Sequence, residues 1–286
     1  MSETFPFSMG YLAELADIRD YSLKDLNENE LPRNLDVTSY DLPKYVDNRN
    51  YCSTVEDQGP LGTCCAHGGT SLFEYIMKKT TGTFVQGSRL FVYYNSRKYA
   101  GLDTNIDSGT FVRSTVKAIV LSGICEESLW KYDIKKFKEQ PSEFLYSNAQ
   151  QFRGTKYLRL DDGKGDTVLK MKNMINSGYG LVVGFPVYDS IQDVTKRQPV
   201  LPFPSRREKL QGGHCVMICG YDSDAPSRNY RDNNETKGAF LALNSWSSRF
   251  ADEGFFWIPE KFVTEGLMMD IWTVTNGTWI DTGAFD

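Results

Sequence analysis

The sequence of 286 residues predicts an α+β fold in two lobes. Between about residue 41 and residue 140, apolar residues recur with a spacing that is typical of helices. From about residue 150 to residue 286, short apolar runs are separated by clusters of Gly, Asp and Asn, as in strands joined by turns. Helices that precede strands in this way favour a helical lobe beside a β-rich lobe.

Three helices are predicted in the first lobe. The second covers residues 88 to about 98, and the third covers residues 111–121 and ends at Ser122-Gly123. The first begins near Thr63, and its apolar residues have the spacing of one packed helix face; they are Ala66, Leu72, Phe73, Ile76 and Met77.

A helix at residues 166–177 and a strand at residues 181–187 are predicted early in the second lobe. Two later strands each carry one polar residue among apolar neighbours, His214 in one and Asn244 in the other. Because side chains alternate between the two faces of a strand, neighbouring strands would bring these two residues within reach of each other.

Gln58 and Cys64 lie six positions apart in the stretch before the first helix. A thiol is a moderate nucleophile with an unperturbed pKa of about 8.5, so it needs a partner that stabilises the thiolate. Gly62-Thr63 can deliver Cys64 to a helix N-terminus, where the helix dipole favours a negative sulfur. The side chain of Gln58 can donate an N–H to the oxyanion that attack on a carbonyl creates.

The chain contains two histidines, His67 and His214, as candidate bases for such a thiol. We favour His214, because Asn244 follows thirty residues later and can hold an imidazole in one tautomer. The adjacent Trp246 can shield that hydrogen bond from water. The alternatives are that His67, three residues after Cys64, is the base and that Cys65 is the nucleophile. We expect His67 to be a core residue and Cys65 to be a small buried hydrophobe.

Four ordered blocks resemble the papain-like cysteine peptidase family. Residues 58–64 resemble the family's Q-G-x-C-G-S-C-W signature, with Cys64 at the nucleophile position. The segment around His214 is similar to the family's histidine strand, and Asn244-Ser245-Trp246 with Glu253-Gly254-Phe255 resembles its N-S-W…G-Y strand. Residues 42–49 resemble the start of a mature enzyme. The four blocks span roughly residues 42–272.

The resemblance implies a two-lobed papain-like fold, in which a helical lobe bearing Cys64 faces an antiparallel β-barrel-like lobe bearing His214 and Asn244. The catalytic domain would comprise residues 41–286, with the helical lobe at about 41–140 and the β lobe at about 150–286. It further implies a cysteine endopeptidase that forms a thioester acyl-enzyme on peptide or protein substrates and uses no cofactor. Its catalytic residues would be Cys64, His214, Asn244 and Gln58.

Candidate substrate-binding residues follow from the same resemblance. Ser108-Gly109 correspond to the glycine pair with which the family builds part of its non-primed subsites, although Ser108 replaces one glycine. Gly184 and Gly213 correspond to positions that line the main specificity pocket, and Trp246 is a further cleft residue.

The far end of the specificity pocket should be closed by the segment Glu265-Gly266-Leu267-Met268. If Glu265 points inward, the pocket tolerates basic side chains; if Met268 does, the pocket is purely apolar. The sequence leaves both alternatives open.

Two departures from the family pattern concern cysteines. Leu61 stands where the family usually has a half-cystine, so that disulfide cannot form, and Cys65 replaces the usual Trp. The first seven residues lack the basic and apolar regions of a signal peptide, and no run is long enough to span a membrane. We therefore expect reduced thiols in the cytoplasm or another reducing compartment, with non-classical export left open.

Residues 1–40 precede the family-like mature start but are far shorter than the family's usual inhibitory pro-domain. We expect a short pro- or regulatory segment that packs over or near the cleft, judging from residues 9–12 and 18–21. The alternative is a stabilising arm on the back of the enzyme. This N-terminal pattern, together with the reduced cysteines, resembles the bacterial xylellain-like members of the family.

Composition excludes several other classes of function. The formal charge is −5, the pI is ≈ 5.3 and no basic stripe is present, which argues against a nucleic-acid partner. Two histidines and no C-x-x-C pair make a metal site unexpected, and there is no phosphate loop or dinucleotide fingerprint. Two alternatives stay open: a binding protein on a degenerate papain-like scaffold, and an acyltransferase or deamidase that uses the same Cys-His-Asn set.

Overall fold

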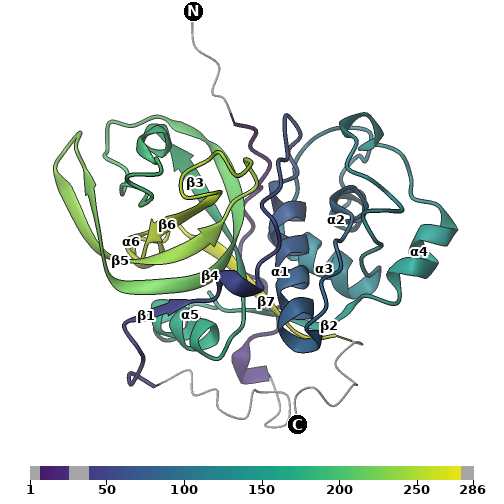
Figure 1. The fold of residues 1–286 in the computed structure, drawn as a ribbon, viewed down its shortest axis with the longest axis horizontal. Helices are drawn as coiled ribbons and strands as arrows, with labels where there is room; N and C mark the ends of the chain where they lie inside the picture. The colour runs from purple at the N-terminus through teal and green to yellow at the C-terminus, as the bar shows by residue number, and fades with distance from the viewer. Residues whose placement is uncertain (1–6, 26–38, 278–286) are drawn as a thin grey trace, which may run out of the picture.

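Two lobes lie side by side in the computed structural model, which describes residues 7–25 and 39–277 (Figure 1). This arrangement of helices and antiparallel sheet confirms the predicted α+β class. Residues 1–6 and 26–38 of the predicted N-terminal segment, and residues 278–286 of the predicted β lobe, lie outside the described residues.

The helical lobe contains the three predicted helices, α1 (Cys64–Thr81), α2 (Arg89–Ala100) and α3 (Val112–Leu121). Helix α1 ends at Gly82, which adopts a left-handed conformation (φ 70°) that glycine tolerates without strain. Helix α2 begins at Ser88, whose side chain accepts a hydrogen bond from the backbone N–H of Phe91. A fourth helix, α4 (Glu143–Ala149), was not predicted; it is seven residues long and buries only Leu145 and Ala149.

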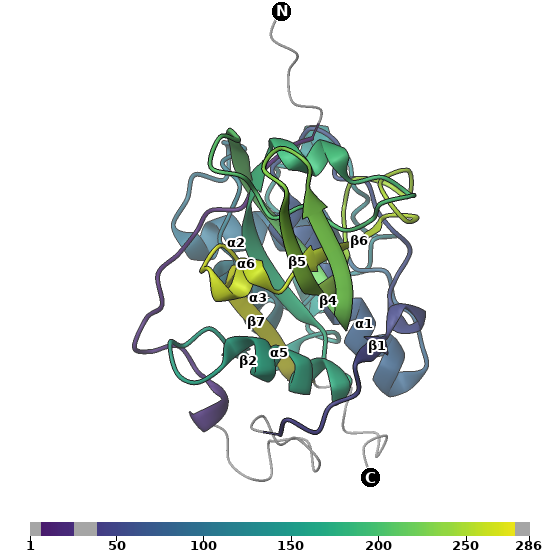
Figure 2. The same ribbon diagram turned by 90° about the vertical axis from the view of Figure 1, so that its left-hand side faces the viewer.

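The second lobe is a seven-stranded antiparallel sheet in the described part of the chain, in the order β2-β7-β3-β4-β5-β6, with β1 paired to β4. Figure 2 shows its strands edge to edge above helix α5. The strands are β1 (Tyr45–Asp47), β2 (Gly154–Arg159), β3 (Leu181–Tyr188), β4 (Leu210–Asn229), β5 (Asn234–Leu243), β6 (Phe255–Pro259) and β7 (Met269–Gly277).

Two helices and four 3-10 turns complete these elements. Their bounds are α5 (Thr167–Asn176), α6 (Lys261–Thr264), η1 (Leu23–Asp25), η2 (Arg49–Tyr51), η3 (Ile134–Lys136) and η4 (Asp189–Asp193). The strands that carry His214 and lead to Asn244 are β4 and β5, which pair directly, so the predicted adjacency of these strands is confirmed.

Helix α1 joins the two lobes, because its buried face packs against β4 of the sheet. Gly68 makes this approach possible: a Cβ there would lie 3.1 Å from a methyl group of Val182 and 3.3 Å from the Cys215 sulfur. One core cluster accordingly includes residues of both lobes, such as Leu72 of α1 and Met217 of β4. A second cluster lies within the sheet lobe.

A buried ion pair fixes α1 to the start of α2. The carboxylate of Glu74 is fully buried and pairs with Arg89 at 2.8 Å, while the N–H of Gly87 donates to the same carboxylate. Burial raises the pKa of Glu74, and the charge of Arg89 opposes that rise. Because both side chains are removed from water, the charge of the Glu74 carboxylate depends on the pairing with Arg89.

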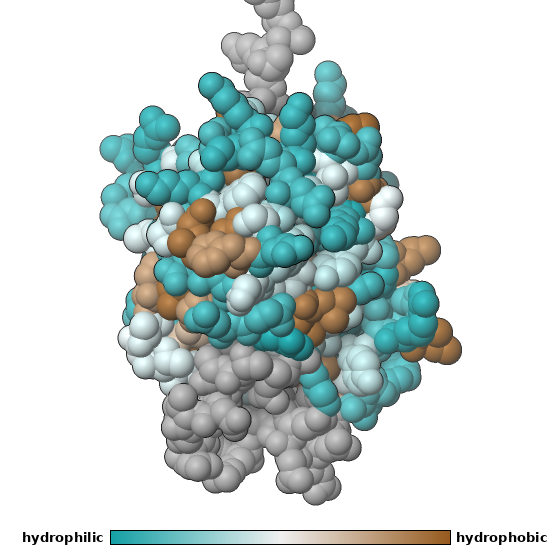
Figure 3. Space-filling view, turned by 90° about the vertical axis from the view of Figure 1, so that its right-hand side faces the viewer, coloured by the Kyte–Doolittle hydropathy of each residue, from teal (hydrophilic) through white to brown (hydrophobic). Residues whose placement is uncertain are grey.

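The outer face of the helical lobe is mostly polar. Its apolar side chains form small groups that are separated by hydrophilic ones (Figure 3). Within residues 7–25 and 39–277, the structure has no helix with both the length and the apolar character that a membrane span requires.

Replacing Arg89 with Met should destabilise the chain by about 3–5 kcal/mol, because it leaves the Glu74 carboxylate buried without a cation. Urea unfolding followed by tryptophan fluorescence measures this loss. The matched control is Arg228→Met, whose partner Glu235 is exposed, as is Arg228 itself; it should cost no more than about 1 kcal/mol. Equal losses in the two variants would contradict the assignment.

Candidate active site

Cys64 is the first residue of α1 and lies at the boundary between the lobes, where it is fully buried. The preceding Thr63 does not cap the helix with its side chain; its hydroxyl instead shares a hydrogen bond of 2.6 Å with the hydroxyl of Tyr132. The N–H groups of the first helical turn therefore face the site without a side-chain cap, and the helix dipole favours negative charge on the sulfur.

His214 of β4 is held by Asn244, the residue that follows β5. The imidazole Nε2 donates to Oδ1 of Asn244 at 2.7 Å, and the same oxygen accepts the N–H of Ser245. The other ring nitrogen, Nδ1, is buried and has no hydrogen-bond partner within the described residues. This nitrogen is therefore available to Cys64, whose thiol interacts with the His214 side chain.

An aromatic stack covers the His214 ring. Trp246 lies against it with ring centroids 4.2 Å apart and planes 22° apart. Phe7 of the N-terminal segment also stacks on Trp246, with ring centroids 4.2 Å apart and planes 10° apart. This stack shields the bond between His214 and Asn244 from water, as the sequence predicts for Trp246.

Gln58 is fixed in one orientation by contacts from both lobes. Its Oε1 accepts the hydroxyl of Ser245 at 2.6 Å, and its backbone carbonyl accepts the hydroxyl of Tyr132 at 2.8 Å. Its Nε2 donates to the carbonyl of Leu61 at 3.0 Å and to the carbonyl of Ser8 at 3.2 Å. The amide donor thus already faces a peptide carbonyl, that of the N-terminal segment.

Opposing effects act on the Cys64 thiol in this closed arrangement. Burial raises the pKa of Cys64 well above its usual value, and the neighbouring Cys65 thiol raises it further. The interaction with His214 lowers that pKa. Desolvation dominates while the cleft is covered, which favours the neutral thiol.

The two alternative residues have other surroundings. The sulfur of Cys65 is buried and donates to the carbonyl of Thr110 at 3.3 Å. The Nδ1 of His67 donates to the carbonyl of Thr63 at 3.1 Å, and its ring meets the Tyr132 ring edge to face. Burial lowers the pKa of His67 to about 3. His67 is therefore a neutral ring within the core at neutral pH.

The N-terminal segment, residues 7–25, runs between the two lobes (Figures 1 and 2). Backbone hydrogen bonds tie it to both walls of the cleft. On the helical side, the N–H of Thr110 donates to the carbonyl of Gly10 at 2.8 Å, and the N–H of Leu12 donates to the carbonyl of Thr110 at 3.0 Å. On the sheet side, the N–H of Tyr11 donates to the carbonyl of Gly213 at 3.1 Å.

Gly10 lies close to the backbones of Gly62 and Gly109. A methyl group at this position would overlap the backbone of Gly62, the loop that leads into Cys64. A methyl group on Gly109 would in turn overlap the backbone of Gly10, and Gly109 has a φ of 72°. Only glycines permit the three backbones to approach one another this closely.

The segment lies opposite to the direction expected of a substrate. The resemblance puts the acyl side of a substrate beside Gly109 and the leaving side beyond His214. A substrate would therefore run from Gly109 toward Trp246. The segment runs from Trp246, where Phe7 packs, to Thr110, which pairs with Tyr11 in a parallel bridge.

The structure places the predicted pocket residues around one side chain, that of Tyr11. Its ring lies directly over Gly184 and Gly213, where added methyl groups would overlap it. The hydroxyl of Ser108 bonds locally to the carbonyl of Gly109, and the segment pairs with the backbone of Thr110.

Neither predicted residue closes the far end of this pocket. Glu265 ends helix α6 and faces a separate surface hollow, and Met268 packs into the core of the sheet lobe. The end is formed by Asp270, whose Oδ2 accepts the hydroxyl of Tyr11 at 2.7 Å. A single acid in the apolar run 267–272 was the sequence signal that could have identified it.

Other supporting residues were also missed. Asp107 accepts the N–H of Gly62 and the hydroxyl of Tyr93, and so connects the loop before Cys64 to the loop at Gly109. Tyr132 and Ser245, described above, hold Gln58. Their spacing in the sequence carries no motif that would have indicated these roles.

On the Trp246 side the cleft continues as an open groove of ≈ 1120 Å³, lined by Asp57, Pro60, Thr195, Trp246 and Arg249 among others. Across the residues that the structure describes, no group of three or more His, Cys, Asp or Glu side chains is arranged to hold a metal ion. All six cysteines are free thiols.

Comparison with known proteins places this geometry in a family. The family model described as papain family cysteine protease matches residues 42–272. An uncharacterised peptidase C1-like protein of Acanthamoeba polyphaga mimivirus is 32% identical to this chain, and the match covers 97% of this chain and 89% of the viral protein.

Solved structures agree with this match. Xylellain, a cysteine protease from Xylella fastidiosa, superposes with a TM-score of 0.76 at 26% identity, over 96% of this chain and 98% of xylellain. Digestive procathepsin L 3 of Tenebrio molitor shares the fold with a TM-score of 0.58 at 20% identity, over 79% of this chain and 67% of that one. The chain therefore belongs to the papain family of cysteine proteases.

Proposed function

We propose that the chain hydrolyses peptide bonds with Cys64 as the nucleophile and His214 as its base. The observation that carries this proposal is the orientation of His214. Its Nε2 is committed to Asn244 at 2.7 Å, so its unpartnered Nδ1 is the nitrogen available to the thiol. This tautomer and orientation are what a thiolate–imidazolium pair requires.

The reaction follows from these positions. The Cys64 thiolate attacks the peptide carbonyl, and the oxyanion is held by the Cys64 backbone N–H and the Gln58 Nε2. His214 then gives its proton to the leaving amine, which departs and leaves a thioester on Cys64. His214 next takes a proton from water, which attacks the thioester, releases the acid product and restores the thiol.

The N-terminal segment is proposed to regulate this site by covering it. The carbonyl of Ser8 occupies the Gln58 donor, and Tyr11 fills the pocket. Phe7 covers Trp246 beside the leaving side. These contacts support a pro- or regulatory segment over a stabilising arm on the back of the enzyme.

A reducing compartment such as the cytoplasm is proposed for the folded chain. All six cysteines are buried free thiols, and Leu61 is buried at the position of the family's missing half-cystine. The core thus contains thiols that an oxidising environment would modify when the chain unfolds.

Gly10→Ala should raise the peptidase activity of the full-length chain about tenfold or more. The added methyl overlaps the Gly62 backbone; overpacking costs about 1–3 kcal/mol, and about 1.4 kcal/mol is tenfold in an equilibrium. Turnover of a fluorogenic peptide panel measures the effect. Gly163→Ala is the control for backbone strain without overlap, because Gly163 is exposed, has a φ of 73° and has no neighbouring atom near the added methyl; it should leave the rate unchanged. If Gly10→Ala lowers stability without raising activity, the segment is a stabilising arm.

Cys64→Ala should abolish turnover in both the full-length chain and its Gly10→Ala variant, because no other thiol faces His214. Cys65→Ala should retain turnover, since the Cys65 sulfur contacts Thr110 instead. Mass spectrometry after treatment with a peptidyl epoxide should place one label per chain on Cys64. Retained turnover in Cys64→Ala, or labelling of Cys65, would refute the assignment. Product masses distinguish hydrolysis from acyl transfer.

Gln58→Ala should lower kcat by about a hundredfold in the Gly10→Ala background, because one donor to the oxyanion is lost. The same rate assay measures this change, and circular dichroism confirms that the fold is retained. Gln151→Ala, on the exposed surface after α4, serves as the control. A loss of less than about threefold would show that Gln58 does not contact the oxyanion.

A further inference from the structure

A fully buried carboxylate forms the floor of the pocket that Tyr11 fills. Asp270 has no exposed surface, and its Oδ2 accepts two hydrogen bonds, one from the hydroxyl of Tyr11 at 2.7 Å and one from the N–H of Glu14 at 3.0 Å. Both donors come from the N-terminal segment. When the segment leaves, this oxygen loses both partners.

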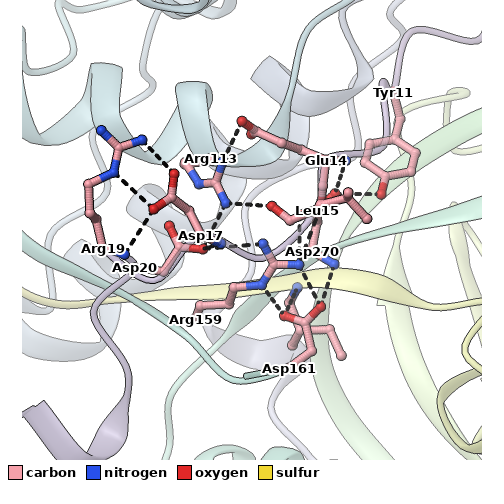
Figure 4. A network of polar contacts seen from close by, with 11 residues as sticks. Tyr11, Glu14, Leu15, Asp17, Arg19, Asp20, Arg113, Arg159, Asp161 and Asp270 are labelled. Atoms are coloured by element: carbon pink, nitrogen blue, oxygen red, sulfur yellow. Dashed lines mark hydrogen bonds and ion pairs between the residues drawn. The ribbon is translucent and has the colours of Figure 1, made fainter. Parts of the chain in front are cut away.

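The other side of Asp270 is held by the protein body (Figure 4). Its Oδ1 lies 3.2 Å from the guanidinium of Arg159. Asp161 accepts two hydrogen bonds from Arg159, each 3.0 Å long, and also accepts the backbone N–H of Asp270 at 2.9 Å. Arg159 and Asp161 are therefore positioning residues that keep the free Oδ2 turned toward the pocket.

We propose that Asp270 determines specificity by selecting substrates with a tyrosine side chain at P2, the second residue on the acyl side of the scissile bond. The proposal rests on the proposed peptidase function. The position is the one that the resemblance to the papain family implies for the main specificity pocket, which Gly184 and Gly213 line here.

A phenol hydroxyl is favoured because the pocket ends in a carboxylate acceptor, which has no exposed surface while the segment with Tyr11 fills the pocket. Phenylalanine would occupy the same walls of Gly184 and Gly213 and leave Oδ2 without a donor. A site built to hydrogen-bond a substrate hydroxyl strongly rejects the analogue that lacks it. Tyr11 shows that a tyrosine ring fits the walls and the floor together.

The surrounding charges favour this neutral donor over lysine or arginine. Arg113 is paired with Glu14 and Asp20, and Asp20 also lies 3.4 Å from Arg159. Glu14 and Asp20 belong to the segment and leave with it. What stays is two carboxylates, Asp161 and Asp270, beside two guanidinium groups, Arg113 and Arg159. These charges compensate one another, so a lysine or arginine side chain of a substrate would find no unpaired negative charge in the pocket.

The test compares peptide substrates that differ only at P2, using the full-length chain carrying Gly10→Ala and the unaltered full-length chain in parallel. The P2 residues are tyrosine, O-methyltyrosine, phenylalanine and arginine. We expect kcat/KM for tyrosine to exceed that for phenylalanine by about tenfold or more. O-methyltyrosine, which has the oxygen but no donor, should be no better than phenylalanine, and arginine should be poorer than tyrosine.

Variants of the floor residue sharpen the comparison. Asp270 has a φ of 52°, a conformation that glycine and asparagine tolerate. Asp270→Gly removes the acceptor and should reduce the ratio of tyrosine to phenylalanine to about one, whereas Asp270→Asn retains a carbonyl acceptor and should keep a preference for tyrosine. Asn233→Gly, at an exposed turn with a φ of 61°, is the control that should leave the ratio unchanged.

The outcomes separate the two proposals. Hydrolysis of all four peptides with equal efficiency for tyrosine and phenylalanine, or a preference for arginine, would overturn the role of Asp270 and leave the peptidase function standing. No hydrolysis of any peptide, together with no epoxide label on Cys64, would overturn the peptidase function itself. The substrate comparison needs no pocket variant, so it decides the question even if Asp270→Gly does not fold.

Discussion

The packing of α1 against β4 is the contact on which the rest of the molecule depends. It brings the N-terminus of a helix, with its uncapped N–H groups, next to a strand that carries an imidazole. Gly68 sets the separation, because its missing side chain leaves room for Val182 and Cys215. A larger residue there would push the helix outward and separate Cys64 from His214, although neither residue had changed. The buried pair of Glu74 and Arg89 holds the same helix from its other side.

The sequence predicted the parts of this arrangement that follow from local rules. The predicted pairing of two strands brought His214 near Asn244, although Asn244 directly follows β5 and does not lie within it, and apolar spacing located α1, α2 and α3 to within one residue at their starts. Apolar spacing did not predict α4, because its seven residues bury only two side chains and show no repeating pattern. Local rules also missed Asp270, because its role depends on a left-handed backbone turn at the start of β7 and on Arg159, 111 residues earlier. Tertiary contacts of this kind leave no periodic signal.

The segment binds groups on both walls of the cleft. Thr110 and Gly213 bind its backbone, Gln58 binds a carbonyl, Trp246 stacks on Phe7, and Asp270 receives Tyr11. Under the proposed function a substrate would compete for the same groups, so tighter binding of the segment would weaken the apparent binding of substrate. Its ion pairs with Arg113 and Arg159 add affinity at positions outside the reacting groups.

The direction of the segment has a kinetic consequence. At the bond after Ser8, the carbonyl faces Gln58, but the amide nitrogen continues toward the pocket instead of toward Trp246, where a leaving amine would depart. A chain in this orientation is bound without being presented for cleavage by the thiol beneath it. If the enzyme removes its own segment, one molecule must cut another. The rate of activation would then be second order in protein concentration. Dilution would preserve the form that retains its segment, and a higher protein concentration would shorten the delay before activity appears.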